Sequence, residues 1–388
     1  MATNTASTVH MPRDRAFFLD PTPWYRRMRQ DHPVWRDPAT GGVMVFRHAD
    51  VMTVLGIPEV FSSRAPPPEG NTLFATSMNF TDDPRHAELR AVVQRSFTAR
   101  RTAGLAARIE AITGGLVADL VASGSGTDLV PAFSGALPAI VIAELLGVPS
   151  ADRERFRAWA DDVVLVGEPD QVAVAQRGME AMAEYFLAMV GTKRADPADD
   201  VMTLLTVAHD EGRLRTDELV DFGLLLLTGG HETTTSLINN TLRCLTEHPD
   251  EAERVRADPT AVPRLLEEVL RFRSPVQTLP RITTRDVELG GAVLAAGTVV
   301  DFTIGSANRD LPGVPDAETF RVRDQPLPHV GFGHGLHSCL GNALARLEGR
   351  IALTALLTRL PRIAVDLDSV VPIPTAGLHG ARHLTVTF

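Results

Sequence analysis

The chain has 388 residues, of which 44% are apolar and 22% charged, and its formal net charge is −10 at pH 7. These values are typical of a globular protein with a sizeable core, and the negative charge argues against binding to nucleic acid. The N-terminus is polar, and the most apolar run, residues 222–227, is too short to span a membrane. Two cysteines, Cys244 and Cys339, make no disulfide framework, so we expect a cytoplasmic protein without a membrane partner.

The first predicted elements are two strands, residues 34–36 and 43–46, which form a hairpin around a glycine-containing turn. From Pro84 to about Leu270, apolar residues recur at spacings of three and four, which predicts helices almost throughout. Strands are predicted again at residues 287–294 and 298–300. The remaining pattern predicts irregular proline-rich chain, a long helix and short closing strands, at residues 311–328, about 340–360 and beyond. We therefore predict one mostly helical domain, residues 1–388, with small sheets at one side.

A long helix is predicted from Thr216, with the hydroxyl at the cap position, to about Glu247. Its centre contains Gly229 and Gly230, and an interior glycine costs a helix about 1 kcal/mol relative to alanine. One interpretation is a packing notch, with threonine hydroxyls bonded back to the backbone. The other is a reaction site, in which missing side chains leave space and an acid and a hydroxyl, Glu232 and Thr233, handle protons.

The segment around Cys339 combines a thiol, two histidines and clustered glycines at positions 331, 333, 335 and 341. Glycines let a backbone fold tightly against a flat ligand. An amphipathic helix follows at once, and a helix N-terminus stabilises a thiolate, which is the form that ligates haem iron. Two alternatives remain: a buried structural cysteine, and a nucleophilic pair of Cys339 with His337.

These residues resemble the cytochrome P450 family. Its haem-loop pattern, Phe-x-x-Gly-x-x-x-Cys-x-Gly, is matched by Phe332, Gly335, Cys339 and Gly341. Its pattern in the middle helix, Ala/Gly-Gly-x-Asp/Glu-Thr, is matched by Gly229, Gly230, Glu232 and Thr233. The resemblance covers nearly the whole chain. It implies a mainly α triangular-prism fold with small β-sheets, like that of the soluble bacterial members.

The resemblance also implies a set of site residues. Haem b would be held by Cys339 as the iron ligand, with Phe332, Gly333 and Gly229 against the macrocycle. The haem propionates would contact His337, Arg281, His86 and Arg90. Thr233 would act on bound oxygen, and Glu232 would help to relay protons. The alternative for each charged residue is a solvated surface position.

A structural ion pair is implied as well. Glu268 and Arg271 match the family's Glu-x-x-Arg pair, which is buried behind the cysteine loop, and either Arg323 or Arg321 would be the third partner.

The function implied is a monooxygenase that inserts one oxygen atom from O2 into a small hydrophobic molecule such as a terpenoid, steroid, fatty acid or polyketide. A ferredoxin and an NAD(P)H-dependent ferredoxin reductase would supply electrons. Some of the arginines of the cysteine side would dock the ferredoxin, and ordinary solvated helix faces are the alternative: Arg95, Arg100, Arg101, Arg346 and Arg350. A peroxide-driven or non-oxygenating enzyme and a non-catalytic haem sensor are the alternatives.

The substrate pocket is expected to be largely apolar. The family's layout draws it from Leu73, Phe74, Met78, Leu225, Gly229, Val276 to Leu279, and Leu378.

Overall fold

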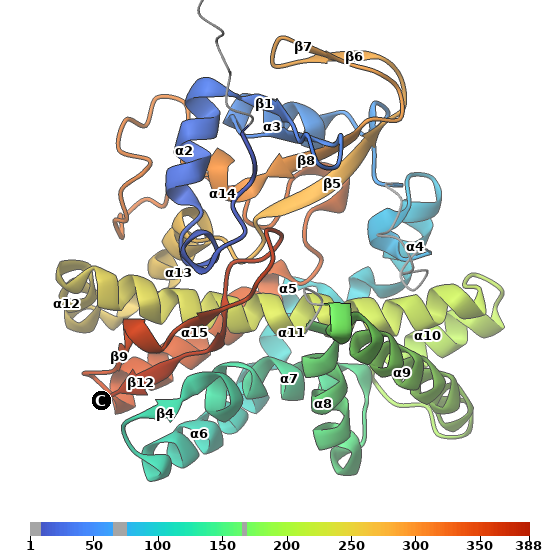
Figure 1. Ribbon diagram of the computed structural model, residues 1–388. Coiled ribbons are helices and arrows are strands. Elements are labelled where there is room, and N and C mark those ends of the chain that lie inside the picture. The colour runs from blue at the N-terminus through green and yellow to red at the C-terminus, as the bar shows by residue number, and fades with distance from the viewer. Residues whose placement is uncertain (1–8, 65–75, 165–168) are drawn as a thin grey trace, which may run out of the picture.

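The computed structural model describes residues 9–64, 76–164 and 169–388 (Figure 1). The helices are α1 (Arg15–Leu19), α2 (Thr22–Asp31), α3 (His48–Gly56), α4 (Arg85–Val93), α5 (Ala99–Gly104), α6 (Ala106–Ser123), α7 (Ala136–Leu146), α8 (Arg153–Val164), α9 (Pro169–Ala195), α10 (Val201–Asp210), α11 (Thr216–Glu247), α12 (Pro249–Ala257), α13 (Val262–Phe272), α14 (Ile304–Ala307) and α15 (Asn342–Arg359). The strands are β1 (Val34–Arg36), β2 (Val43–Val45), β3 (Phe61–Ser62), β4 (Thr127–Asp128), β5 (Thr278–Thr283), β6 (Val287–Leu289), β7 (Ala292–Leu294), β8 (Val299–Thr303), β9 (Ala364–Val365), β10 (Val371–Pro372), β11 (Ala381–His383) and β12 (Thr385–Thr387). The mainly α fold with small sheets is as predicted.

Helix α11 runs through the middle of the molecule, between the five-stranded sheet and the helices α6 to α9 (Figure 1). It packs against α7, α9, α13 and α15. Five of its apolar side chains are fully buried in the main core: Leu224, Leu227, Leu237, Ile238 and Leu242. Because so many neighbours surround α11, a polar side chain near its centre loses most of its contact with water.

The predicted bounds of α11 are confirmed, but the predicted cap is wrong. Arg215 is the cap residue and Thr216 is the first helical residue. The backbone N–H of Arg215 donates to Glu218 Oε2 at 2.8 Å. The Glu218 side chain therefore supplies the hydrogen-bond acceptor at the N-terminus of the helix. The Thr216 hydroxyl instead lies 3.1 Å from Nε2 of His209 on α10.

The largest sheet joins distant parts of the chain in the order β1-β2-β8-β5-β3. The predicted hairpin β1–β2 is antiparallel, and β2 pairs in parallel with β8. Strand β5, which the sequence analysis missed, pairs antiparallel with β8 and places Arg281 opposite Val300. It carries Pro280, which argues against a strand in a sequence pattern, whereas its two neighbouring strands stabilise it as a strand.

Cys244 lies in the core of α11 and is fully buried. Burial raises the pKa of this thiol to about 11, which keeps it protonated and unreactive. Over the described ranges, no helix combines the length and the apolar character needed to cross a membrane.

Candidate active site

The backbone around Cys339 is folded by its glycines. Gly333 and Gly335 both have φ of +71°, a conformation that other residues rarely adopt. A Cβ on Gly331 would lie 2.7 Å from the carbonyl oxygen of Leu270, so this glycine lets the loop approach α13. The N–H of Cys339 donates to the carbonyl oxygen of Phe332 at 2.8 Å, which closes the loop. The arrangement presents backbone without bulky side chains, as a flat ligand requires.

The thiol of Cys339 is less activated than the sequence predicted. Helix α15 begins only at Asn342, three residues later, and Gly341 is its cap. Burial raises the pKa of Cys339, although the N–H of Gly341 and the charges of Arg90 and Arg346 act in the opposite direction. The N–H of Gly341 at the start of α15 therefore acts in the predicted direction, but loss of hydration outweighs it. A bond to a cation such as haem iron would stabilise the thiolate form of Cys339.

A buried ion pair supports the loop from behind. Arg271 is completely buried and donates to both carboxylate oxygens of Glu268, with Nε at 2.8 Å and Nη2 at 2.7 Å. Its remaining donors bind carbonyl oxygens of Asn308, Ala317 and Thr319. Arg323 Nη1 lies 3.5 Å from Glu268 Oε1 and is the third ionic partner, while Arg321 contributes only its backbone N–H. The pair locks the irregular segment before the loop onto α13.

Three cationic or potentially cationic side chains gather beside the cysteine loop, from three distant parts of the chain. His86 on α4 and His337 of the loop have ring centroids 4.1 Å apart. Arg281 on β5 is near enough that its charge lowers the pKa of His337. Ser63, which follows β3, is a member that the sequence analysis missed: its Oγ lies 2.9 Å from His337 Nε2. Its only sequence signal is its place at the end of a short strand.

Burial opposes positive charge throughout this cluster. Burial, followed by the repulsion of His86 and Arg281, lowers the pKa of His337 to about 3. Burial also lowers the pKa of His86, and it lowers that of Arg281 to about 10. Nε2 of His86 is buried and has no hydrogen-bond partner in the described part of the chain. A carboxylate placed among these groups would relieve all of these effects, so the cluster fits haem propionates.

Arg281 and His86 are buried, so the alternative of a solvated surface charge is wrong for both. Arg90 is half-buried, and its guanidinium donates to the carbonyl oxygens of Leu336 at 3.3 Å and Ser338 at 2.9 Å. Arg90 therefore also ties α4 to the cysteine loop.

The two glycines at the centre of α11 have different environments. A Cβ on Gly230 would lie 3.2 Å from Cδ1 of Ile142, so Gly230 is a packing notch against α7. A Cβ on Gly229 would meet nothing within 4 Å, and Gly229 is exposed. The packing-notch interpretation therefore holds for Gly230, while Gly229 leaves the open space that the reaction-site interpretation needs. Thr233, half-buried, donates its hydroxyl to the carbonyl oxygen of Gly229 at 2.7 Å, which places it beside the open position.

Glu232 is buried on the same helix, and its Oε1 accepts a hydrogen bond of 3.0 Å from the hydroxyl of Ser236. The sequence analysis did not single out Ser236, although its position four residues after an acid was a usable signal.

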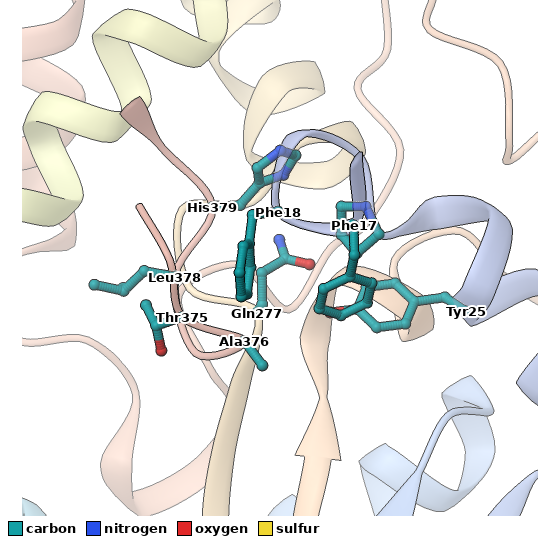
Figure 2. A pocket seen from close by; sticks show the side chains of 9 residues that line it. Phe17, Phe18, Tyr25, Gln277, Thr375, Ala376, Leu378 and His379 are labelled. Atoms are coloured by element: carbon teal, nitrogen blue, oxygen red, sulfur yellow. The ribbon is translucent and has the colours of Figure 1, made fainter. Parts of the chain in front are cut away.

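The expected pocket residues are placed unevenly. Leu73 and Phe74 lie outside the described residues, Met78 is buried in the main core, and Leu225 is half-buried. Val276 and Leu378 form a β-bridge, so these two segments do meet. Leu378 also lines a small surface pocket, in which Figure 2 shows it on the opposite side of Gln277 from the α1–α2 residues Phe17 and Tyr25.

The mainly α fold and the glycine-rich cysteine loop together define a class of haem-thiolate proteins. The profile of the family described as Cytochrome P450 matches residues 175–378, and the chain belongs to this family. It is 39% identical over 376 residues to the putative cytochrome P450 YjiB of Bacillus subtilis strain 168, covering 94% of this chain and 93% of that protein. It is 40% identical over 377 residues to the cyclomarin C epoxidase CymV of Salinispora arenicola strain CNS-205, covering 94% and 95%.

Solved structures of cytochromes P450 have the same fold. CYP109E1 of Bacillus megaterium, in complex with testosterone, superposes with a TM-score of 0.89 at 36% identity, covering 96% of this chain and 99% of that one. A mutant of P450 EryK in complex with erythromycin B has a TM-score of 0.87 at 36% identity, covering 98% of each chain. The chain is therefore a cytochrome P450 monooxygenase of the triangular-prism fold. Its cofactor is haem b, and it uses O2, a small hydrophobic substrate and a redox partner.

Proposed function

We propose that this enzyme hydroxylates or epoxidises a polycyclic or macrocyclic hydrophobic molecule of the steroid or polyketide class. Two similar structures support this class, because they hold testosterone and erythromycin B, and the relative named for the epoxidation of cyclomarin C supports the reaction type. On this chain, the half-buried Leu225 and the open Gly229 stand one turn apart on α11, which suits a bulky apolar molecule.

The residue roles proposed here rest on one observation, the cluster of the buried His86 and Arg281 with the half-buried His337 beside the cysteine loop. Cys339 would ligate the iron, and the three cluster residues would bind the propionates together with Arg90. Phe332 and Gly333 would lie against the macrocycle. Haem iron with a thiolate ligand supplies the activation of O2.

Protons for the reaction are proposed to pass through side chains of α11. Gly229 leaves space for oxygen and substrate, and Thr233 donates a hydrogen bond there when it releases the Gly229 carbonyl. Glu232 carries a proton from the protein interior toward Thr233. Proton transfer by positioned groups of this kind accelerates reactions by about 10²- to 10⁴-fold.

A ferredoxin with an NAD(P)H-dependent ferredoxin reductase is the electron source that we propose, with residues 1–388 acting as one catalytic domain in the cytoplasm. Three exposed arginines support a docking surface next to α15: Arg95 in η2 (Gln94–Phe97), Arg100 in α5 and Arg350 in α15. None of them has an ion-pair partner in the described ranges, and α5 packs against both η2 and α15. Arg101 and Arg346 are less suited, because they already pair with Asp199 and Glu267.

The substrate class is tested by optical titration of the haem enzyme with steroids and macrolides, followed by turnover with NADH, a ferredoxin and its reductase. A Soret shift with one class, and an oxygenated product that requires the ferredoxin, is the expected result. Product formed only with hydrogen peroxide would overturn the ferredoxin proposal, and a Soret band perturbed only by fatty acids would overturn the substrate class.

The docking surface is tested separately. Replacing Arg95 and Arg100 by glutamate should raise the KM for the ferredoxin about tenfold, because reversed charges slow association. Arg36→Glu combined with Arg285→Glu, both at exposed positions outside η2, α5 and α15, is the control with the same net charge. An equal rise in KM for both proteins would refute the assignment of this surface.

A further inference from the structure

Most of the buried and half-buried hydroxyl groups of α11 bond the backbone of their own helix, and Ser236 differs from them. Five threonines donate to the backbone carbonyl oxygen four residues earlier, at distances of 2.7 to 2.9 Å: Thr228, Thr233, Thr235, Thr241 and Thr246. Such back-bonding is the usual behaviour of a helical hydroxyl, because the carbonyl is within reach. Ser236 has the same option at the carbonyl of Glu232. Its Oγ donates instead to the side-chain Oε1 of Glu232, at 3.0 Å.

This hydrogen bond is fully enclosed by protein. Ser236 has no exposed surface and Glu232 is 8% exposed. A hydroxyl that donates to a carboxylate makes a charge-assisted hydrogen bond, which is stronger than one to a neutral carbonyl and stronger still away from water. The contact therefore fixes the position of one carboxylate oxygen of Glu232.

A segment from the far end of the chain closes over Ser236. A Cβ on Gly380 would lie 2.0 Å from Ser236 Oγ and 2.9 Å from Ser236 Cβ, so the absence of a side chain at Gly380 gives the hydroxyl its place. One turn further along α11, Nδ2 of Asn240 donates to the carbonyl oxygen of His379 at 2.8 Å and to that of Arg273 at 3.1 Å. This anchor holds the backbone next to Gly380 against the helix.

We propose that Ser236 is a positioning residue for proton delivery, which acts by holding the Glu232 carboxylate in the orientation that serves Thr233. Ser236 neither gains nor loses a proton: the hydroxyl hydrogen stays on Oγ while Glu232 exchanges its proton with its other neighbours. Gly380 is needed for the same arrangement, because any larger residue there would displace the Ser236 hydroxyl. The inference rests on the catalytic role proposed for Glu232.

The test compares Ser236→Ala with Thr235→Val in the haem-loaded enzyme with its redox partners. Thr235 is the matched control, because it is the adjacent buried hydroxyl and bonds only its own helix backbone, at 2.9 Å. Ser236→Ala should lower product formed per NADH consumed about tenfold, since one charge-assisted hydrogen bond is lost. It should also enlarge the solvent isotope effect on turnover, and leave the Soret shift and the affinity for substrate unchanged. Thr235→Val should match the wild type in every readout.

Two further variants separate this proposal from the role of Glu232. In a Glu232→Gln background, adding Ser236→Ala should cause no further loss, because Ser236 acts only through that carboxylate. Gly380→Ala should reproduce the loss of coupling while retaining the hydroxyl. If Glu232→Gln impairs turnover and Ser236→Ala does not, the positioning role is refuted and the proposed function stands. If Glu232→Gln itself turns over normally, the proposed function of Glu232 fails, and the inference fails with it.

Discussion

The stability of this protein is expected to fall as the pH rises from 5 to 8, because of one buried carboxyl group. Glu348 on α15 is 3% exposed, and its Oε2 makes no hydrogen bond with any described residue. Burial raises its pKa to about 8. A neutral carboxylic acid is tolerated in this core, whereas the carboxylate is not.

The size of the effect follows from linkage between protonation and folding. The folded-state pKa of about 8 lies above the ordinary value of 4.5, so stability is highest below 4.5 and is lost as the pH rises through the folded-state pKa. At these pH values Glu348 is ionised in the unfolded chain but protonated in the folded one, which favours unfolding. Relative to low pH, the free energy of unfolding is therefore lower by about 1 kcal/mol at pH 5 and by about 3 kcal/mol at pH 7. This difference of about 2 kcal/mol is a large part of a typical folding free energy.

Urea unfolding of Glu348→Gln and wild type, followed by circular dichroism between pH 5 and pH 8, measures the effect. Glutamine does not ionise, so the free-energy difference between the two proteins should change by about 2 kcal/mol from pH 5 to pH 7 in favour of the variant. Glu253→Gln, which removes a carboxylate that is 75% exposed, is the control and should show a constant difference. A constant difference for Glu348→Gln as well would refute the reasoning.

Three further predictions concern the site and its support. Cys339→Ser should remove the absorption band typical of the carbon monoxide complex of a thiolate-ligated haem, and an unchanged spectrum would exclude Cys339 as the ligand. Arg281→Gln should speed haem transfer to apomyoglobin about tenfold. Folding stability should not change, because Arg281 forms no ion pair with a carboxylate of the described chain that the substitution would break. Arg271→Met should cost about 3–5 kcal/mol in urea unfolding, since the buried Glu268 loses the cation that binds both of its carboxylate oxygens. The exposed control Arg213→Met should cost less than about 1 kcal/mol, and equal losses would contradict the argument.

The sequence by itself determined the features that depend on neighbouring residues. Apolar spacing and acids in the first turn were enough to predict the bounds of α11, because helix formation is local. The cysteine loop was recognisable for the same reason: its glycines and its thiol lie within a dozen residues, so their spacing carries the chemistry. These two segments were sufficient for the family, the cofactor and the reaction class.

Only the tertiary structure decided which polar groups lose water and which partners they meet. Arg281 and Arg95 look alike in the sequence, yet one is buried beside His337 and the other is exposed, because β5 is enclosed by strands from distant parts of the chain. The raised pKa of Cys339 has the same origin, since burial is a property of the whole fold and outweighs the adjacent N–H of Gly341. The hydroxyl of Ser236 is likewise directed to Glu232 where Gly380, far away in the chain, closes against it. Desolvation is the sum of many distant contacts, and local sequence cannot specify it.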